Sequence, residues 1–140
     1  MSDVHRFAIR VYYEDTDAAG IVYYANYLKF AERARTEMMR DSGSSHSEMI
    51  EKFDTAFAVS RCEVDYLKPA RLDDLLTVET RVLEVGGAAV SLDQRVLREG
   101  DLLARLTIRI ACLNSKGRPQ RLPEPVRVAL TAFRISEELV

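Results

Sequence analysis

Residues 12–40, which read YYEDTDAAGIVYYANYLKFAERARTEMMR, decide the fold of this chain. They follow and overlap an alternating segment, Arg6 to Tyr13, that predicts a first strand. The acidic and small residues 14–20 come next and do not suit a strand interior. From about Tyr24 to Arg40 the apolar residues recur at steps of three and four, which predicts a long amphipathic helix. The stretch therefore predicts a strand, a tight acidic loop and a helix in immediate succession.

The predicted helix ends at Ser42-Gly43. Two of its buried positions, Ala31 and Ala34, are small enough for a sheet to approach the helix closely. The predicted buried stripe consists of Tyr27, Phe30 or Ala31, Ala34 and Met38. A short second helix is predicted at Ser47 to Phe53, and a last one at about Pro125 to Phe133.

Four segments between the second and last helices are rich in Val, Ile, Leu and Thr. They are Ala56 to Tyr66, Leu75 to Val85, Ala88 to Leu97 and Leu102 to Leu113. The turns between them are too short for parallel crossovers, so we expect antiparallel hairpins. With the first strand they make an α+β fold, a five-stranded antiparallel sheet curled around one long helix, in a single domain over residues 1–140. A sheet of this kind leaves an edge to be paired or protected, which favours self-association.

Composition narrows the classes of function. The formal net charge is -2 and the pI is near 5.7, which does not favour a nucleic-acid binder. No apolar run approaches the length of a membrane span, and the N-terminus does not resemble a signal peptide. Cys62 and Cys112 stand apart in strand-like surroundings, so we expect buried free thiols and a cytoplasmic location. No zinc-like spacing of Cys and His is present, and we expect neither a metal nor a cofactor.

Asp17 is the candidate catalytic residue. It lies next to the predicted turn at Gly20, shortly before a helix whose first amides have no intrahelical partner and attract negative charge. A carboxylate beside such amides is sufficient to hydrolyse an activated acyl group. From spacing alone, the more common role for such an aspartate is to hydrogen-bond its own turn. An Asp-x-Asp cation site is a further alternative, but no glycine-rich phosphate loop accompanies it.

Tyrosines cluster around the same loop. The group consists of Tyr12, Tyr13, Tyr23, Tyr24 and Tyr27, which either pack half-buried at the junction of strand and helix or, for one or two of them, line an acyl pocket. Tyr24 also stands where its backbone amide could bind a carbonyl oxygen. Spacing does not choose between these roles.

The segment Tyr12 to Tyr27, together with Phe30 to Arg35 and Asp65 to Asp74, closely resembles the 4-hydroxybenzoyl-CoA thioesterase family, and most nearly its Tol-Pal-associated YbgC-like branch. The resemblance implies a hotdog fold and homodimers or homotetramers with acyl pockets between subunits. It implies that Asp17 is the catalytic carboxylate, as nucleophile or general base, and that the Tyr24 amide polarises the thioester carbonyl. The YbgC-like branch has histidine where this chain has Tyr24.

The resulting prediction is an acyl-CoA thioesterase. Its site consists of catalytic Asp17 and Tyr24 and substrate-binding Tyr13, Gly20, Tyr23 and Tyr27. The alternative is a non-catalytic hotdog module that binds acyl-CoA or acyl-carrier protein. A dehydratase is less favoured, because such enzymes generally use a catalytic histidine and neither His5 nor His46 lies in the Asp17 loop. Basic residues at Lys68 and Arg71, or at Lys116, Arg118 and Arg121, are candidates for contact with the CoA phosphates.

Overall fold

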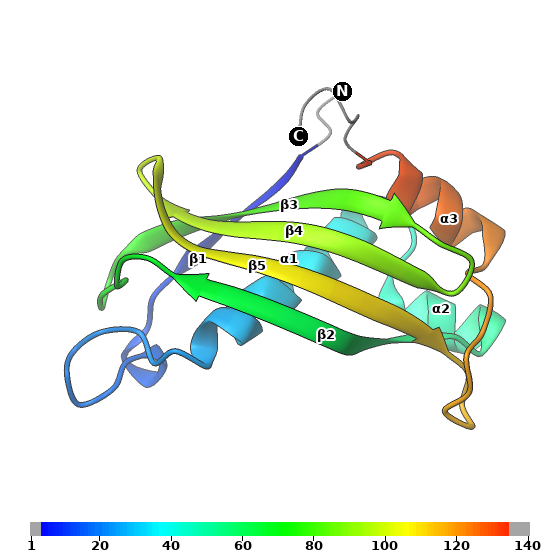
Figure 1. Cartoon of the computed structure of the whole chain (residues 1–140), viewed down its shortest axis with the longest axis horizontal. Helices are drawn as coiled ribbons and strands as arrows, with labels where there is room; N and C mark the ends of the chain where they lie inside the picture. The colour runs from blue at the N-terminus through cyan, green and yellow to red at the C-terminus, as the bar shows by residue number, and fades with distance from the viewer. Residues whose placement is uncertain (1–3, 135–140) are drawn as a thin grey trace.

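The computed structural model describes residues 4–134 and consists of one five-stranded antiparallel sheet with helices (Figure 1). The strands are β1 (His5–Arg10), β2 (Ala56–Tyr66), β3 (Leu75–Val85), β4 (Ala89–Arg98) and β5 (Asp101–Leu113), in the spatial order β1-β3-β4-β5-β2. The helices are α1 (Asn26–Asp41), α2 (His46–Phe53) and α3 (Glu124–Thr131). The predicted α+β hotdog class is confirmed. No helix among residues 4–134 combines the length and apolarity that a membrane crossing requires.

Most element bounds match the prediction to within two residues. The first strand is the main difference, because it ends at Arg10 instead of Tyr13. Tyr13–Asp15 form a short 3-10 turn, and the amide of Tyr12 donates to the Asp15 carboxylate at 2.8 Å. The predicted long helix begins at Asn26 instead of Tyr24. Side-chain hydrogen bonding thus overrides the alternation that extended the predicted strand.

Helix α1 packs one face on the sheet, as its sequence pattern predicts. Phe30, Ala31 and Ala34 are fully buried. Gln94, on the central strand β4, donates from Nε2 to the carbonyl of Ala31 and to Thr80 Oγ1, both at 2.9 Å. Its Oε1 accepts from Arg35 Nη1 at 3.0 Å. A buried amide with all these partners ties α1 to the sheet at one position.

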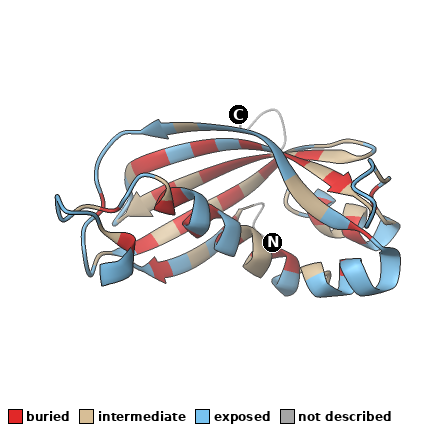
Figure 2. Cartoon of the chain, turned by 90° about the horizontal axis from the view of Figure 1, so that it is seen from below, coloured by how far each residue is buried: buried red, intermediate tan, exposed pale blue. Residues whose placement is uncertain are grey.

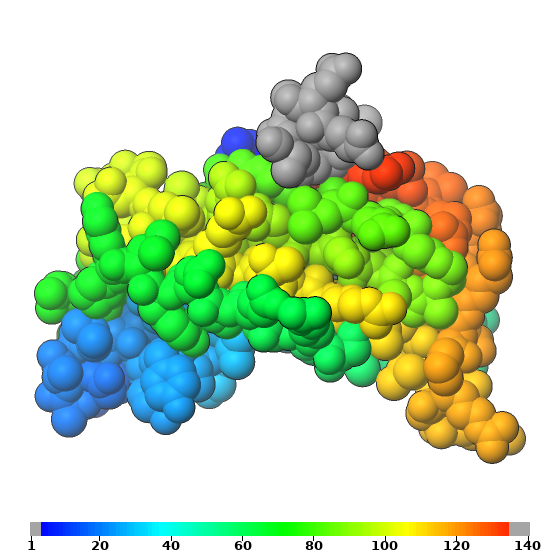
Figure 3. All heavy atoms as spheres, in the orientation of Figure 1, coloured from blue at the N-terminus to red at the C-terminus, as the bar shows by residue number. Residues whose placement is uncertain are grey.

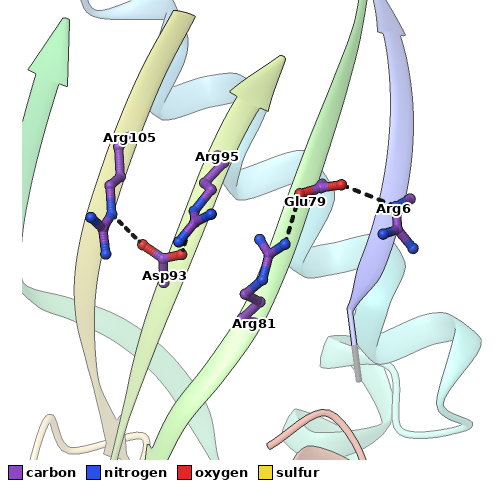
Figure 4. Close-up of polar contacts among 6 residues, drawn as sticks. All are labelled: Arg6, Glu79, Arg81, Asp93, Arg95 and Arg105. Carbon is purple, nitrogen blue, oxygen red and sulfur yellow. Dashed lines mark hydrogen bonds and ion pairs between the residues drawn. The ribbon is translucent and has the colours of Figure 1, made fainter. Parts of the chain in front are cut away.

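The other face of the sheet carries charged side chains (Figure 4). Asp93 is almost completely buried there, and accepts from Arg95 and Arg105. Glu79 accepts from Arg6 and Arg81. Burial opposes the charge of Glu79, but the two guanidinium groups more than offset it and hold the pKa of Glu79 below its usual value.

Strand β2 is the exposed edge of the sheet. Most of its residues are exposed, whereas buried positions recur along β3, β4 and β5 (Figure 2). The expectation that both cysteines are buried is therefore wrong for Cys62, which lies exposed in the middle of this strand, and right for Cys112. An edge strand has a sheet neighbour on one side only, so its alternation does not guarantee burial.

His46, at the start of α2, provides a pH-dependent contribution to stability. Its Nδ1 lies 3.5 Å from Thr36 Oγ1, and burial lowers the pKa of the imidazole. As pH falls through the ordinary pKa of about 6.5, the unfolded chain takes up a proton that the folded chain resists, so the free energy of unfolding decreases. Urea unfolding at neutral and mildly acidic pH should show this loss. In His46→Phe the loss should be smaller, and equal losses in both proteins would contradict the assignment.

Candidate active site

The loop that carries Asp17 is anchored by Asp15, a buried carboxylate. Asp15 accepts from the Tyr12 amide through Oδ2 and from the Asn26 side chain through Oδ1, at 2.8 and 2.9 Å. Its own carbonyl accepts from the Tyr23 amide at 2.8 Å. The loop is closed by a bridge between Thr16 and Val22. Asp15 therefore joins both ends of the loop to the first residue of α1.

Asp17 lies exposed at the tip of this loop. Its Oδ1 accepts from the amide of Ala19 at 2.9 Å, which is the local turn interaction that spacing favours. Gly20 has a φ of +79°, as the tight turn requires, and its amide donates to the Asp17 carbonyl at 3.0 Å. Within residues 4–134 the Asp17 carboxylate has no second hydrogen bond. One of its oxygens is thus available for chemistry.

Tyr24 lies two residues before α1 with its backbone amide free. No acceptor for this N–H, or for that of the adjacent Ala25, exists in the part of the chain that the structure describes, whereas the amides of Tyr23 and Asn26 are both satisfied. The carbonyl of Tyr24 accepts from the Tyr66 hydroxyl at 3.0 Å. The free N–H itself belongs to the Tyr23–Tyr24 peptide, whose Tyr23 carbonyl accepts from the Asn26 amide at 2.8 Å. An unpaired N–H near a helix N-terminus, in a peptide held in this way, is suited to bind a developing oxyanion.

A hollow of about 300 Å³ lies beside this amide. Its lining is mostly apolar and aromatic, and consists of Ile21, Val22, Tyr24, Tyr27, Tyr66, Leu67, Lys68 and Pro69. Asp17 is not part of the lining, but Ile21 and Val22 belong to its loop. The aromatic rings of Tyr27 and Tyr66 meet edge to face at 5.5 Å and form the floor between α1 and β2.

The structure brings together some of the predicted tyrosines and separates one. Tyr23 packs on Tyr24, with ring centroids 4.8 Å apart, and the adjacent Tyr24, with a smaller contribution from the charge of Asp17, raises the pKa of Tyr23. Tyr27 lines the hollow but is buried, and its hydroxyl accepts from the Ala70 amide at 3.1 Å. Tyr13 is 82% exposed and lines none of the hollows described here. Asp17, Tyr23 and Tyr24 therefore form one group.

Sequence reasoning missed Asp15, Asn26 and Tyr66. The spacing of Asp15 and Asn26 carries no signal, because the contact depends on how the loop folds back. Tyr66 ends a strand far along the chain, and only the sheet topology brings it to α1. Only a three-dimensional structure reveals that Asp15 is buried between two amide donors.

The two groups of candidate phosphate-binding residues lie at opposite ends of the molecule. The loop after β2 pairs with the Asp17 loop, because the Val22 amide donates to the Ala70 carbonyl at 2.8 Å and Ile21 bridges Arg71. In Figure 3 the corresponding green and blue atoms are neighbours at one end. Residues 116–121 lie near the end of α2, where Gln120 donates to Phe53. Of these five candidates, Lys68 and Arg71 are therefore the ones at the end of the molecule that holds the candidate site.

Comparisons with known proteins agree with this fold. The family model described as "Thioesterase-like superfamily" matches residues 11–130. The acyl-CoA thioesterase YbgC of Haemophilus influenzae is 45% identical over 124 residues, which are 88% of this chain and 91% of the relative. The acyl-CoA thioester hydrolase YbgC of Escherichia coli is 40% identical over 86% of this chain and 91% of its own. The crystal structure of a probable thioesterase from Bartonella henselae superimposes with a TM-score of 0.83 at 37% identity, over 86% of this chain and 99% of that one.

The chain belongs to the thioesterase-like superfamily of hotdog proteins. Within it, the chain is a thioesterase similar to the YbgC acyl-CoA thioesterases.

Proposed function

We propose that this chain hydrolyses acyl-CoA thioesters, with Asp17 as nucleophile or general base and the Tyr24 amide as oxyanion donor. The observation that carries the proposal is the unpaired Tyr24 N–H beside a hollow, together with the Asp17 carboxylate of the preceding loop, which has one oxygen without a hydrogen bond among the described residues. The relatives named as acyl-CoA thioesterases support the substrate class.

The chemistry balances without a metal or a further catalytic side chain. An oxygen of Asp17, or of a water molecule that gives a proton to Asp17, attacks the thioester carbonyl carbon. The carbonyl oxygen becomes an oxyanion that accepts from the Tyr24 amide, and the bond to sulfur then breaks. The CoA thiolate takes up a proton, and an acyl-Asp17 anhydride, if formed, is opened by water to give the free acid.

The side chains around Tyr24 have positioning roles in this proposal. Tyr66 fixes the adjoining Tyr24–Ala25 peptide through its hydrogen bond to the Tyr24 carbonyl. Gly20 allows the turn that presents Asp17, Tyr27 forms the floor of the hollow, and Tyr23 packs on Tyr24 beside it. Tyr13, which lines no hollow among the described residues, has no positioning role in this proposal. Lys68 and Arg71 contact the CoA phosphates, or the prosthetic group of an acyl-carrier protein.

A panel of acyl-CoAs tests the activity directly. Free thiol should be released continuously from at least one aliphatic or aromatic acyl-CoA, in amounts far above the protein concentration. A melting temperature that rises with acyl-CoA while no thiol appears would instead identify a binding module. The two unpaired cysteines favour a reducing compartment, such as the cytoplasm, for this enzyme.

A homodimer joined through β2 completes the proposed enzyme. The outer edge of β2 has no neighbour among the described strands, so its backbone groups are available to pair. Antiparallel pairing of two β2 strands about their middle would make one continuous sheet. It would also cover the opening between α1 and β2 in each protomer, where the hollow beside Tyr24 lies.

Cys62 reports on this pairing because it lies exposed near the middle of β2. Two such strands paired about their centres bring the Cys62 thiols of both protomers within reach of a short bis-maleimide. We expect a cross-linked dimer from the wild type and from Cys112→Ser, and none from Cys62→Ser. Gel electrophoresis under denaturing conditions measures it. Absence of cross-linking in a protein that sediments as a dimer would place the interface elsewhere.

A further inference from the structure

Two small cavities lie near the C-terminal end of α1, away from the hollow beside Tyr24, and share one wall. The first has a volume of about 120 Å³ and the second about 130 Å³. Phe57 and His46 line both of them. Their rings meet edge to face at 5.8 Å and 87°. The side chains of Phe57 and His46 therefore form a partition between the first cavity and the second.

The first cavity and the hollow beside Tyr24 both lie between α1 and β2, in a region that we call the seam. At one end α1 contributes Tyr27, the segment just before it contributes Tyr24, and β2 contributes Tyr66. At the other end α1 contributes Arg35 and β2 contributes Val59. From Asn26 to Arg35 the helix rises about 14 Å. The hollow beside Tyr24 and the first cavity therefore both lie between α1 and β2, about two and a half helical turns apart along α1.

The lining of the first cavity is mostly apolar, with Glu32, Arg35 and His46 as its polar members. Met38, Met39, Leu92 and Ile110 provide apolar walls. The guanidinium of Arg35, which also lines it, is already bonded to Gln94. Burial lowers the pKa of His46, so the partition is uncharged at neutral pH. A dry cavity of about 150 Å³ holds a benzene molecule, so each of these cavities has room for about four to six carbon atoms.

We infer that the acyl chain of the substrate lies along the seam between α1 and β2, and that Phe57 and His46 set the longest chain the enzyme accepts. The inference rests on the proposed function and adds the substrate class, a straight aliphatic acyl chain of limited length. A short ring such as benzoyl would remain near Tyr24 and leave the first cavity empty. Phe57 and His46 are specificity-determining residues that take no part in bond breaking.

A chain-length profile tests this inference. The value of kcat/KM is measured for straight-chain acyl-CoAs from butanoyl to palmitoyl in the wild type and in Phe57→Ala. Removal of the Phe57 ring joins the two cavities, so the preferred chain should lengthen by about four carbons. Leu92→Phe, which fills the first cavity, should shorten it. Phe7→Ala is the matched control, because Phe7 is also a half-buried phenylalanine on the core but lines neither cavity.

A second measurement does not depend on turnover. The rise in melting temperature caused by free straight-chain acids, from hexanoic to palmitic, should reach its maximum at a longer acid in Phe57→Ala than in the wild type and Phe7→Ala. If profiles for turnover and binding are the same in all folded variants, the inference is overturned and the thioesterase stands. If thiol is never released but the binding maximum shifts, the proposed position of the acyl chain is confirmed and the proposed hydrolase activity is refuted. Should Phe57→Ala fail to fold, an unchanged profile in Leu92→Phe overturns the inference equally.

Discussion

Asp17→Asn should lower kcat for a good acyl-CoA by about a thousandfold, within the range that a general base contributes. The amide has no basic or nucleophilic oxygen of the same strength, but it retains a carbonyl oxygen. That oxygen can still accept from the Ala19 amide, as Asp17 Oδ1 does at 2.9 Å. The loop should therefore keep its shape, and the melting temperature should change little. Loss of activity without loss of stability separates a chemical role from a local turn interaction.

Glu14→Gln is the matched control for Asp17→Asn. Glu14 is exposed in the same loop system and also carries one negative charge, but it is not part of the proposed chemistry. Its replacement should leave kcat/KM within about twofold of the wild type, the scale of an exposed charge. If both variants are equally active, or both equally impaired, the special role of Asp17 is refuted. If only Asp17→Asn is impaired, trapping of an acylated protein in a single turnover of the wild type distinguishes a nucleophilic Asp17 from a general base.

Asp15→Ala should destabilise the protein by about 2–4 kcal/mol, because a buried acceptor is removed from between two donors. The Tyr12 amide and the Asn26 side chain would lose partners at 2.8 and 2.9 Å inside the protein. Activity should also fall in the fraction that remains folded, since the same carboxylate connects the Asp17 loop to α1. Urea unfolding gives the first quantity, and kcat at a temperature well below the transition gives the second.

A double-mutant cycle with Asn26→Ala shows whether the two residues act together. If Asp15 and Asn26 form one unit, the double variant should be less destabilised than the sum of the single variants. Thr16→Ala provides a control in the same loop, because the Thr16 side chain makes a single hydrogen bond, to the Tyr13 carbonyl at an exposed position. Thr16→Ala should lower the free energy of unfolding by at most about 1 kcal/mol. Additive effects of Asp15 and Asn26 would contradict the anchoring role.

Much of the fold could be predicted from local patterns. The apolar stripe of α1 and the β2 and β3 bounds follow from periodicity, because a helix or strand with one buried face needs its apolar residues at fixed steps. The prediction was wrong where side chains compete with the backbone ladder, as at the end of β1. It was also wrong for Cys62, since a pattern of alternation does not say which strand lies at the edge of the sheet.

The sequence by itself determined the class of this protein and the loop that holds its candidate carboxylate. Asp17, the turn at Gly20 and the start of α1 are neighbours along the chain, so their proximity needs no tertiary information. Only the tertiary structure decided that Asp15 anchors the loop, that Tyr66 holds the Tyr24 peptide, and that Phe57 and His46 divide the space behind α1. Those contacts join residues up to 42 positions apart, and the sheet order that brings them together depends on packing of the whole chain and not on any local pattern.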